Sequence, residues 1–192
     1  MPTLISPLEE LCEAAQREGL SCSYLPIDDQ LPIEYLLCFL GQHDGHEIIV
    51  ECSFPQSLID TDDPELGPGA ATDVPDLLQL IVRLSVSIDM SCAGELSRFM
   101  IEVNRSLAVG QFGFCLDTST VYLQYALAST SRKIDPLVFT FLVGNFQFAC
   151  DWLLRPIKDV ALARLTCDAA IETLKRDGFP VVPMHPGFSK KL

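Results

Sequence analysis

Basic residues are scarce in this chain: its 192 residues include 13 lysines and arginines against 26 aspartates and glutamates, a formal net charge of −13 at pH 7. A nucleic-acid surface needs clustered cations to neutralise phosphates, so we exclude nucleic acid as a partner. No glycine-rich loop that could cradle a phosphate opens a helix after an apolar run, which removes the common nucleotide-binding motifs. Strong acidity favours solubility and basic partners, and it carries no information about the fold.

Histidine is also rare, with three in the chain, and none of the eight cysteines forms a C-x-x-C pair. A cysteine nucleophile needs a base nearby, and no local signature surrounds any cysteine, so we expect no enzyme of that kind. The N-terminal segment is acidic and lacks the basic n-region of a secretory signal. We therefore predict a reduced, cytoplasmic protein whose cysteines are small core residues.

Hydrophobic residues make up 48% of the chain, which is enough for a core and excludes disorder of the whole chain. Acidic residues, prolines and glycines concentrate in residues 57–75, and we interpret this segment as an acidic surface loop within one domain. The sequence predicts an α+β domain over residues 1–156, an additional C-terminal helix over 157–178 and an extended tail over 179–192.

The central stretch of the chain changes its hydrophobic period twice. Residues 78–88 alternate between apolar and polar side chains, which predicts a long strand with one buried face. The side-chain oxygen of Ser91 can then cap the N-terminus of a helix, and the negative charge of Glu95 lies near its first turn, where it suits the helix dipole. Its apolar face is formed by Leu96, Phe99, Met100, Val103 and Leu107. Residues 112–116 and 121–127 alternate again on either side of a turn, so the unit is strand, helix, hairpin.

The flanking segments contain both helix and strand signals. Ser6 and Pro7 predict the start of a first helix that Gly19 closes, and a short strand follows over residues 21–27. Strands are expected over 35–40 and 47–54, joined by a hairpin at Asp44-Gly45.

A long helix starting at Pro136 is apolar on nearly every side, so a membrane span has to be considered. Because Asn145, Gln147 and Asp151 interrupt the apolar run, we expect a helix buried against the sheet or a second subunit, and no membrane span. Pro156 is expected to kink or break this helix.

The predicted hairpin at Asp44-Gly45 holds the candidate metal ligands. His43, Asp44, His46 and Glu47 could donate to a divalent ion, with Cys38 or Cys52 completing the set. The other interpretation is a polar hairpin tip, where such residues are ordinary. We predict no metal and no cofactor, and we keep a metal-binding protein or enzyme that uses this hairpin as the alternative function.

Four segments resemble a known fold. Residues 77–88, 95–105, 113–117 and 121–127 are similar to a strand, the second helix and the following hairpin of the type III secretion chaperone-like fold. That fold includes the YbjN family of bacterial sensory-transduction regulators. The resemblance covers residues 7–156, while the rest of the chain and the length of the acidic loop look like additions.

The resemblance implies an antiparallel sheet flanked by helices, in the order α-β-β-β-(β)-α-β-β-α. It also implies a small acidic cytoplasmic protein, usually a homodimer, that binds another protein or peptide without catalysing a reaction. In the family the second helix and its hairpin lie at the dimer contact, which points to Phe99, Val103, Tyr122 and Tyr125. The alternative interface lies on the long helix around Phe146 and Trp152.

Overall fold

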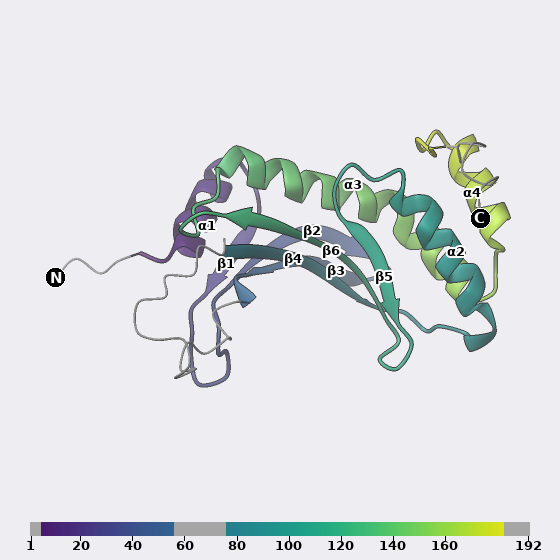
Figure 1. The fold of residues 1–192 in the computed structure, drawn as a ribbon, viewed down its shortest axis with the longest axis horizontal. Helices are drawn as coiled ribbons and strands as arrows, with labels where there is room; N and C mark the ends of the chain where they lie inside the picture. Colours follow the sequence, from purple (N-terminus) through teal and green to yellow (C-terminus); the bar gives the residue numbers. More distant parts are fainter. Residues whose placement is uncertain (1–4, 56–75, 183–192) are drawn as a thin grey trace, which may run out of the picture.

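The protein forms one open antiparallel sheet with its helices on one side, as Figure 1 shows for the computed structural model, which describes residues 5–55 and 76–182. The elements follow one another as α1 (Pro7–Arg17), β1 (Cys22–Leu25), β2 (Tyr35–His43), β3 (His46–Ser53), β4 (Asp76–Ser85), the short 3-10 helix η2 (Met90–Cys92), α2 (Ala93–Asn104), β5 (Gln111–Cys115), β6 (Thr120–Ser129), α3 (Pro136–Ala161) and α4 (Cys167–Arg176). The predicted acidic loop and the tail beyond Val182 lie outside the described residues.

The strands are ordered β1-β2-β3-β4-β6-β5, and every neighbouring pair is antiparallel. This arrangement confirms the predicted α+β class, and β4 supplies the fourth strand that the sequence left open. The long strands β4 and β6 pair over their whole length, from Asp76 opposite Ser129 to Ser85 opposite Thr120. Strand β4 lies inside the sheet beside β3, and β6 lies between β4 and the edge strand β5.

The alternation in β4 is confirmed by burial. Leu78, Leu80 and Val82 are completely buried and face the helices, while Arg83 is exposed on the opposite face. Helices α1, α2 and α3 all lie on this first face, and in the described part of the chain no helix covers the second face (Figure 1). The core therefore lies between one face of the sheet and the helical layer.

Local signals place several elements as expected. The Ser6 side chain accepts a hydrogen bond from the Leu8 amide, Pro7 opens α1, and Gly19 follows the helix with a φ of +88°. Asp44 and Gly45 both have positive φ, which is the conformation of a type I′ turn. Because that turn needs only two residues, β2 and β3 continue to His43 and His46, beyond the predicted strand ends.

Two predictions about helix ends were wrong. Asp89, not Ser91, supplies the capping oxygen, and it caps η2 by accepting from the Ser91 amide. Helix α3 passes through Pro156 without ending, so the predicted domain boundary lies inside a helix and the additional helix begins at Cys167. An internal proline costs about 3 kcal/mol. Beyond it, complete burial of three more side chains offsets that cost: Ile157, Val160 and Ala161.

Candidate functional site

Three of the six predicted interface residues lie in the core of the single chain. Phe99, Val103 and Phe146 have no exposed surface. They offer nothing to a partner, so the interface prediction was wrong for these three. The six-stranded sheet and the helical layer together bury the apolar stripe of α2 and the inner side of α3.

The other three predicted residues are partly exposed and lie apart. Tyr122 is on the helix-free face of the sheet, where its ring lies against Gly113: a Cβ at Gly113 would be 2.5 Å from ring atoms. Tyr125 lines a hollow of about 410 Å³ beside residues 108–111. Trp152 lies on α3, far along the chain from both tyrosines.

The largest apolar side chains left exposed on one element belong to α3. Leu137 is 68% exposed, Phe141 58% and Phe148 42%. Together with Gly144 they recur every three or four residues and form one face of the helix, opposite the side that is buried on the sheet. We call these four residues the outer stripe. Val138, also exposed, flanks it.

The outer stripe carries no charge. Residues 136–150 contain no Asp, Glu, Lys or Arg, although the chain as a whole has a net charge of −13. By length and composition α3 could cross a membrane, with a mean hydropathy of 1.5, but 44% of that window is buried inside the protein. The core helix of a soluble protein gives the same signal, so this hydropathy does not identify a membrane span.

The end of the outer stripe nearest Trp152 is covered by the chain itself. Phe179, which follows α4, stacks on Phe148 with ring centroids 6.0 Å apart and an interplanar angle of 18°. The Phe179 ring is also 5.7 Å from that of Trp152. We call Phe148, Trp152 and Phe179 the aromatic end. Leu137 and Phe141, at the other end, remain bare.

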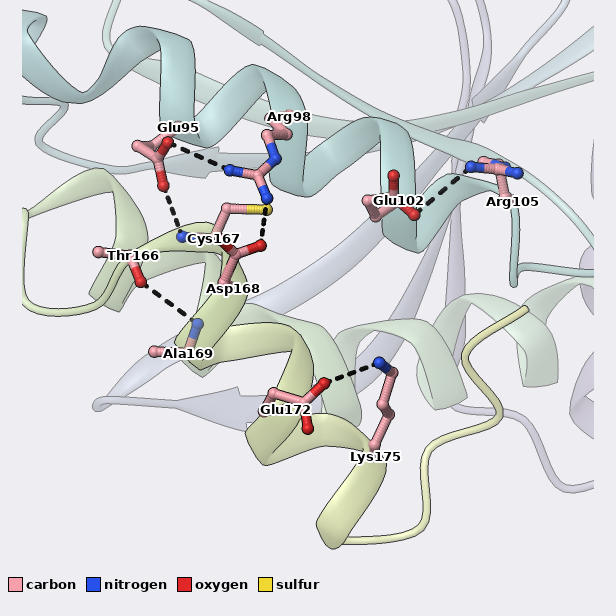
Figure 2. A network of polar contacts seen from close by, with 10 residues as sticks. All are labelled: Glu95, Arg98, Glu102, Arg105, Thr166, Cys167, Asp168, Ala169, Glu172 and Lys175. Atoms are coloured by element: carbon pink, nitrogen blue, oxygen red, sulfur yellow. Dashed lines mark hydrogen bonds and ion pairs between the residues drawn. The ribbon is translucent and has the colours of Figure 1, made fainter. Parts of the chain in front are cut away.

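A polar network at the start of α4 fixes the segment that brings Phe179 into place (Figure 2). The Arg98 guanidinium, on α2, pairs with Asp168 and also lies 3.6 Å from Glu95. A second oxygen of Glu95 accepts a hydrogen bond from the Cys167 amide at 2.8 Å, and Thr166 caps the same helix end. The carboxylates lie at the N-terminus of α4, where its dipole favours negative charge.

The chain after α4 is also held beside the C-terminal end of α2. The Val182 amide donates to the Ser106 hydroxyl at 2.9 Å, so the segment carrying Phe179 is fixed at both ends. Cys167, at the centre of the network, is fully buried, and burial raises the pKa of its thiol although Arg98 opposes the shift. A neutral thiol is a poor nucleophile. The hydrogen bond from the Cys167 amide and the Arg98–Asp168 ion pair join the start of α4 to α2.

The helix-free face of the sheet is chemically mixed. Leu37, Glu51 and Ile81 stand beside one another across β2, β3 and β4. Arg83 forms an ion pair with Glu51, and Phe39 is 41% exposed near the edge. Because charged and apolar groups alternate here, this face has a weaker apolar character than the outer stripe of α3.

The hairpin tip that suggested a metal holds an ion pair instead. The Lys158 Nζ atom donates to Asp44 at 2.7 Å, and His43 lies 3.5 Å from the same carboxylate. Cys38 and Cys52 are fully buried in the core. Across residues 5–55 and 76–182, no three His, Cys, Asp or Glu side chains gather closely enough to hold an ion. The contact joins the β2–β3 hairpin to the end of α3.

We expect this contact to be visible in the titration of Asp44. The hydrogen bond from Lys158, followed by the charge of His43, lowers the pKa of the Asp44 carboxyl. Replacing Lys158 by methionine should raise that pKa toward its ordinary value in a carboxyl NMR titration. Asp89 is the control, because Ser91 lowers its pKa and no lysine contributes. An unchanged Asp44 pKa in the variant would contradict the contact.

The sign of the linked stability effect follows from the lowered pKa. A carboxyl whose pKa is lower in the folded protein stabilises the fold above its unfolded pKa of about 3.9, and this contribution is lost as the pH falls through the folded pKa. The stability difference between the wild-type protein and Lys158→Met is therefore expected at neutral pH and should disappear in strong acid.

All eight cysteines are free thiols in the structure. The Sγ atoms of Cys12 and Cys22 are 3.6 Å apart, and burial raises the pKa of the Cys22 and Cys150 thiols to about 12. Such thiols stay protonated at neutral pH and act as small apolar groups.

A scan against protein-family models, a search of curated proteins and a search of solved structures each found no match. The fold therefore sets the class of this protein as α+β: residues 5–55 and 76–182 form an open six-stranded antiparallel sheet and four α-helices. On this fold, the outer stripe of α3 is an apolar surface without charged side chains.

Proposed function

We propose that this protein is a non-enzymatic binding module that acts through protein–protein contact, as its resemblance to the type III secretion chaperone-like fold and the YbjN family implies. The observation that carries the proposal is the outer stripe of α3, where large apolar side chains are exposed side by side. Contiguous apolar surface of this kind marks interaction sites on soluble proteins.

The chemistry of the stripe defines its partner. With no charge between Asp135 and Asp151, recognition has to come from apolar burial, worth about 1.5–3 kcal/mol for each large side chain that becomes fully buried. The stripe is therefore suited to an apolar helix or segment of another polypeptide.

A photo-reactive phenylalanine analogue at position 141 tests the proposal in living cells. Irradiation should yield discrete protein adducts, because Phe141 projects from the stripe. The same analogue at Gln42, an exposed position on β2, should yield none. Adding Leu137→Asp should abolish the adducts at 141. A folded, expressed protein that forms no adduct at 141 would contradict the proposal.

A further inference from the structure

We propose that Cys12 and Cys22 form a reversible disulfide, which joins α1 covalently to the edge strand β1 when the protein is exposed to a small-molecule disulfide. Neither residue belongs to the outer stripe, so the inference is independent of the proposed function. Three features support it: the contact between the two sulfur atoms, the hydrogen bonds that hold the backbone around them, and the unequal exposure of the two thiols.

The first feature is the contact between the sulfur atoms, which come from different elements. Cys12 lies in α1 and Cys22 is the first residue of β1, and their Sγ atoms are 3.6 Å apart. A disulfide has an S–S distance of about 2.05 Å, so the two atoms have to approach by about 1.5 Å. Small changes in the side-chain dihedral angles can supply this movement.

The second feature is a pair of hydrogen bonds that fix α1 relative to the start of β1. The Gln16 side chain, on α1, donates from Nε2 to the Cys22 carbonyl at 2.9 Å. In the connection between the two elements, the Leu20 amide donates to the Ala15 carbonyl at 3.0 Å. Because the fold holds the two thiols in contact, the reaction between them is intramolecular and has a high effective concentration. The internal disulfide should therefore be favoured over mixed disulfides with small thiols.

The third feature is the difference in exposure between the thiols. Cys12 is 5% exposed, whereas Cys22 is only partly buried, so a small oxidant reaches Cys22 first. Cys38 lies directly opposite Cys22 on β2 and is the other thiol that could compete, but it has no exposed surface. These positions make Cys22 the residue that is attacked from solution and Cys12 the residue that completes the bond.

The reaction consists of two successive thiol–disulfide exchanges. The Cys22 thiolate attacks one sulfur of the oxidant, and the other sulfur leaves as a thiolate. The Cys12 thiolate then attacks the Cys22 sulfur of the mixed disulfide, and the second sulfur of the oxidant leaves. The protein loses two electrons and two protons, and the oxidant takes them up as it becomes two thiols.

Burial makes this reaction slow at neutral pH. It raises the pKa of the Cys22 thiol to about 12 and also raises the pKa of the Cys12 thiol, so little of either is present as the reactive thiolate. The pair therefore stays reduced during brief contact with an oxidant. The rate of disulfide formation should rise about tenfold for each pH unit between about pH 7 and 9, in proportion to the thiolate fraction.

Peptide mapping of the unmodified protein tests the inference. The protein is incubated to equilibrium with millimolar glutathione disulfide at about pH 9, alkylated, and cut with a glutamate-specific protease. Glu18 lies between Cys12 and Cys22, and Glu34 lies between Cys22 and Cys38, so the digest separates the three thiols. We expect the Cys12 peptide linked to the Cys22 peptide, and its release by dithiothreitol. A link between Cys22 and Cys38, or Cys22 left as a glutathione adduct or a free thiol, would overturn the inference.

Two matched substitutions distinguish the proposed pair from its neighbour. Cys12→Ala should leave Cys22 as a glutathione adduct, while Cys38→Ala should still form the Cys12–Cys22 bond. Loss of that bond in a folded Cys38→Ala protein would overturn the pairing, and the map of the unmodified protein depends on neither variant.

Amide hydrogen exchange measures what the bond does to the fold. Oxidation should slow exchange in α1 by roughly tenfold or more, because a helix that is cross-linked to β1 cannot open locally. Exchange in α4, which contains neither cysteine of the pair, should not change and provides the control. Equal exchange rates of α1 in the reduced and oxidised protein would contradict the proposed joining of α1 to β1.

Discussion

Replacing Phe146 by alanine is expected to lower the free energy of unfolding by about 3–5 kcal/mol, the range for removing a large buried aromatic side chain. Phe146 is fully buried. Its ring and Leu123 both lie within 3.3 Å of the position that a Cβ on Gly110 would occupy, so α3, β6 and the turn before β5 meet tightly at this point. The remaining groups cannot collapse without moving a strand, and a cavity should remain.

Urea unfolding of Phe146→Ala at two protein concentrations measures this effect. The loss should be the same at both concentrations, because the side chain packs within one chain. Phe141→Ala is the matched control on the opposite side of the same helix, and its effect on the monomer should be within about 0.5 kcal/mol. Equal effects of the two substitutions would contradict the packing of Phe146 in the core of one chain.

Asn104→Ala is expected to lower the free energy of unfolding by about 2–3 kcal/mol, because it leaves two backbone groups without partners. The Asn104 Nδ2 atom donates to the Phe112 carbonyl at 2.8 Å, and the Phe112 amide donates back to Oδ1 at 2.7 Å. Strand β5 is at the edge of the sheet, so this side chain takes the place of a neighbouring strand where β5 begins.

Amide hydrogen exchange at Phe112 provides the direct measurement. Protection should fall in Asn104→Ala, whereas Asn104→Asp should retain the acceptor and lose only the donor. Asn145→Ala is the control, since the Asn145 side chain donates to the Phe141 carbonyl within its own exposed helix face. If Phe112 exchanged equally fast in the unmodified protein and Asn104→Ala, the paired hydrogen bonds would be refuted.

The sequence predicted the apolar character of the candidate site on α3, but not which side of the helix stays exposed. The sequence indicates that α3 is apolar around its circumference, but it does not tell which side meets the sheet. Phe146 and Phe141 are the same residue type a short distance apart, yet one is fully buried and the other is 58% exposed. Trp152 was identified as a possible anchor, while Phe179 was missed because an aromatic residue after a helix end carries no pattern of its own.

Local chemistry determined the elements of this protein. The two-residue period produced β4, Asp44-Gly45 produced the β2–β3 hairpin, and Ser6-Pro7 began α1, because each depends on side chains and dihedral angles within a few residues. Tertiary structure decided which surfaces meet. Helix α3 continues through Pro156 because Ile157 and Val160 are buried in the core, and α4 packs on the rest of the chain because its apolar face is buried there. A hydrophobic period identifies residues that share a face, but whether that face becomes covered depends on segments far away in the chain.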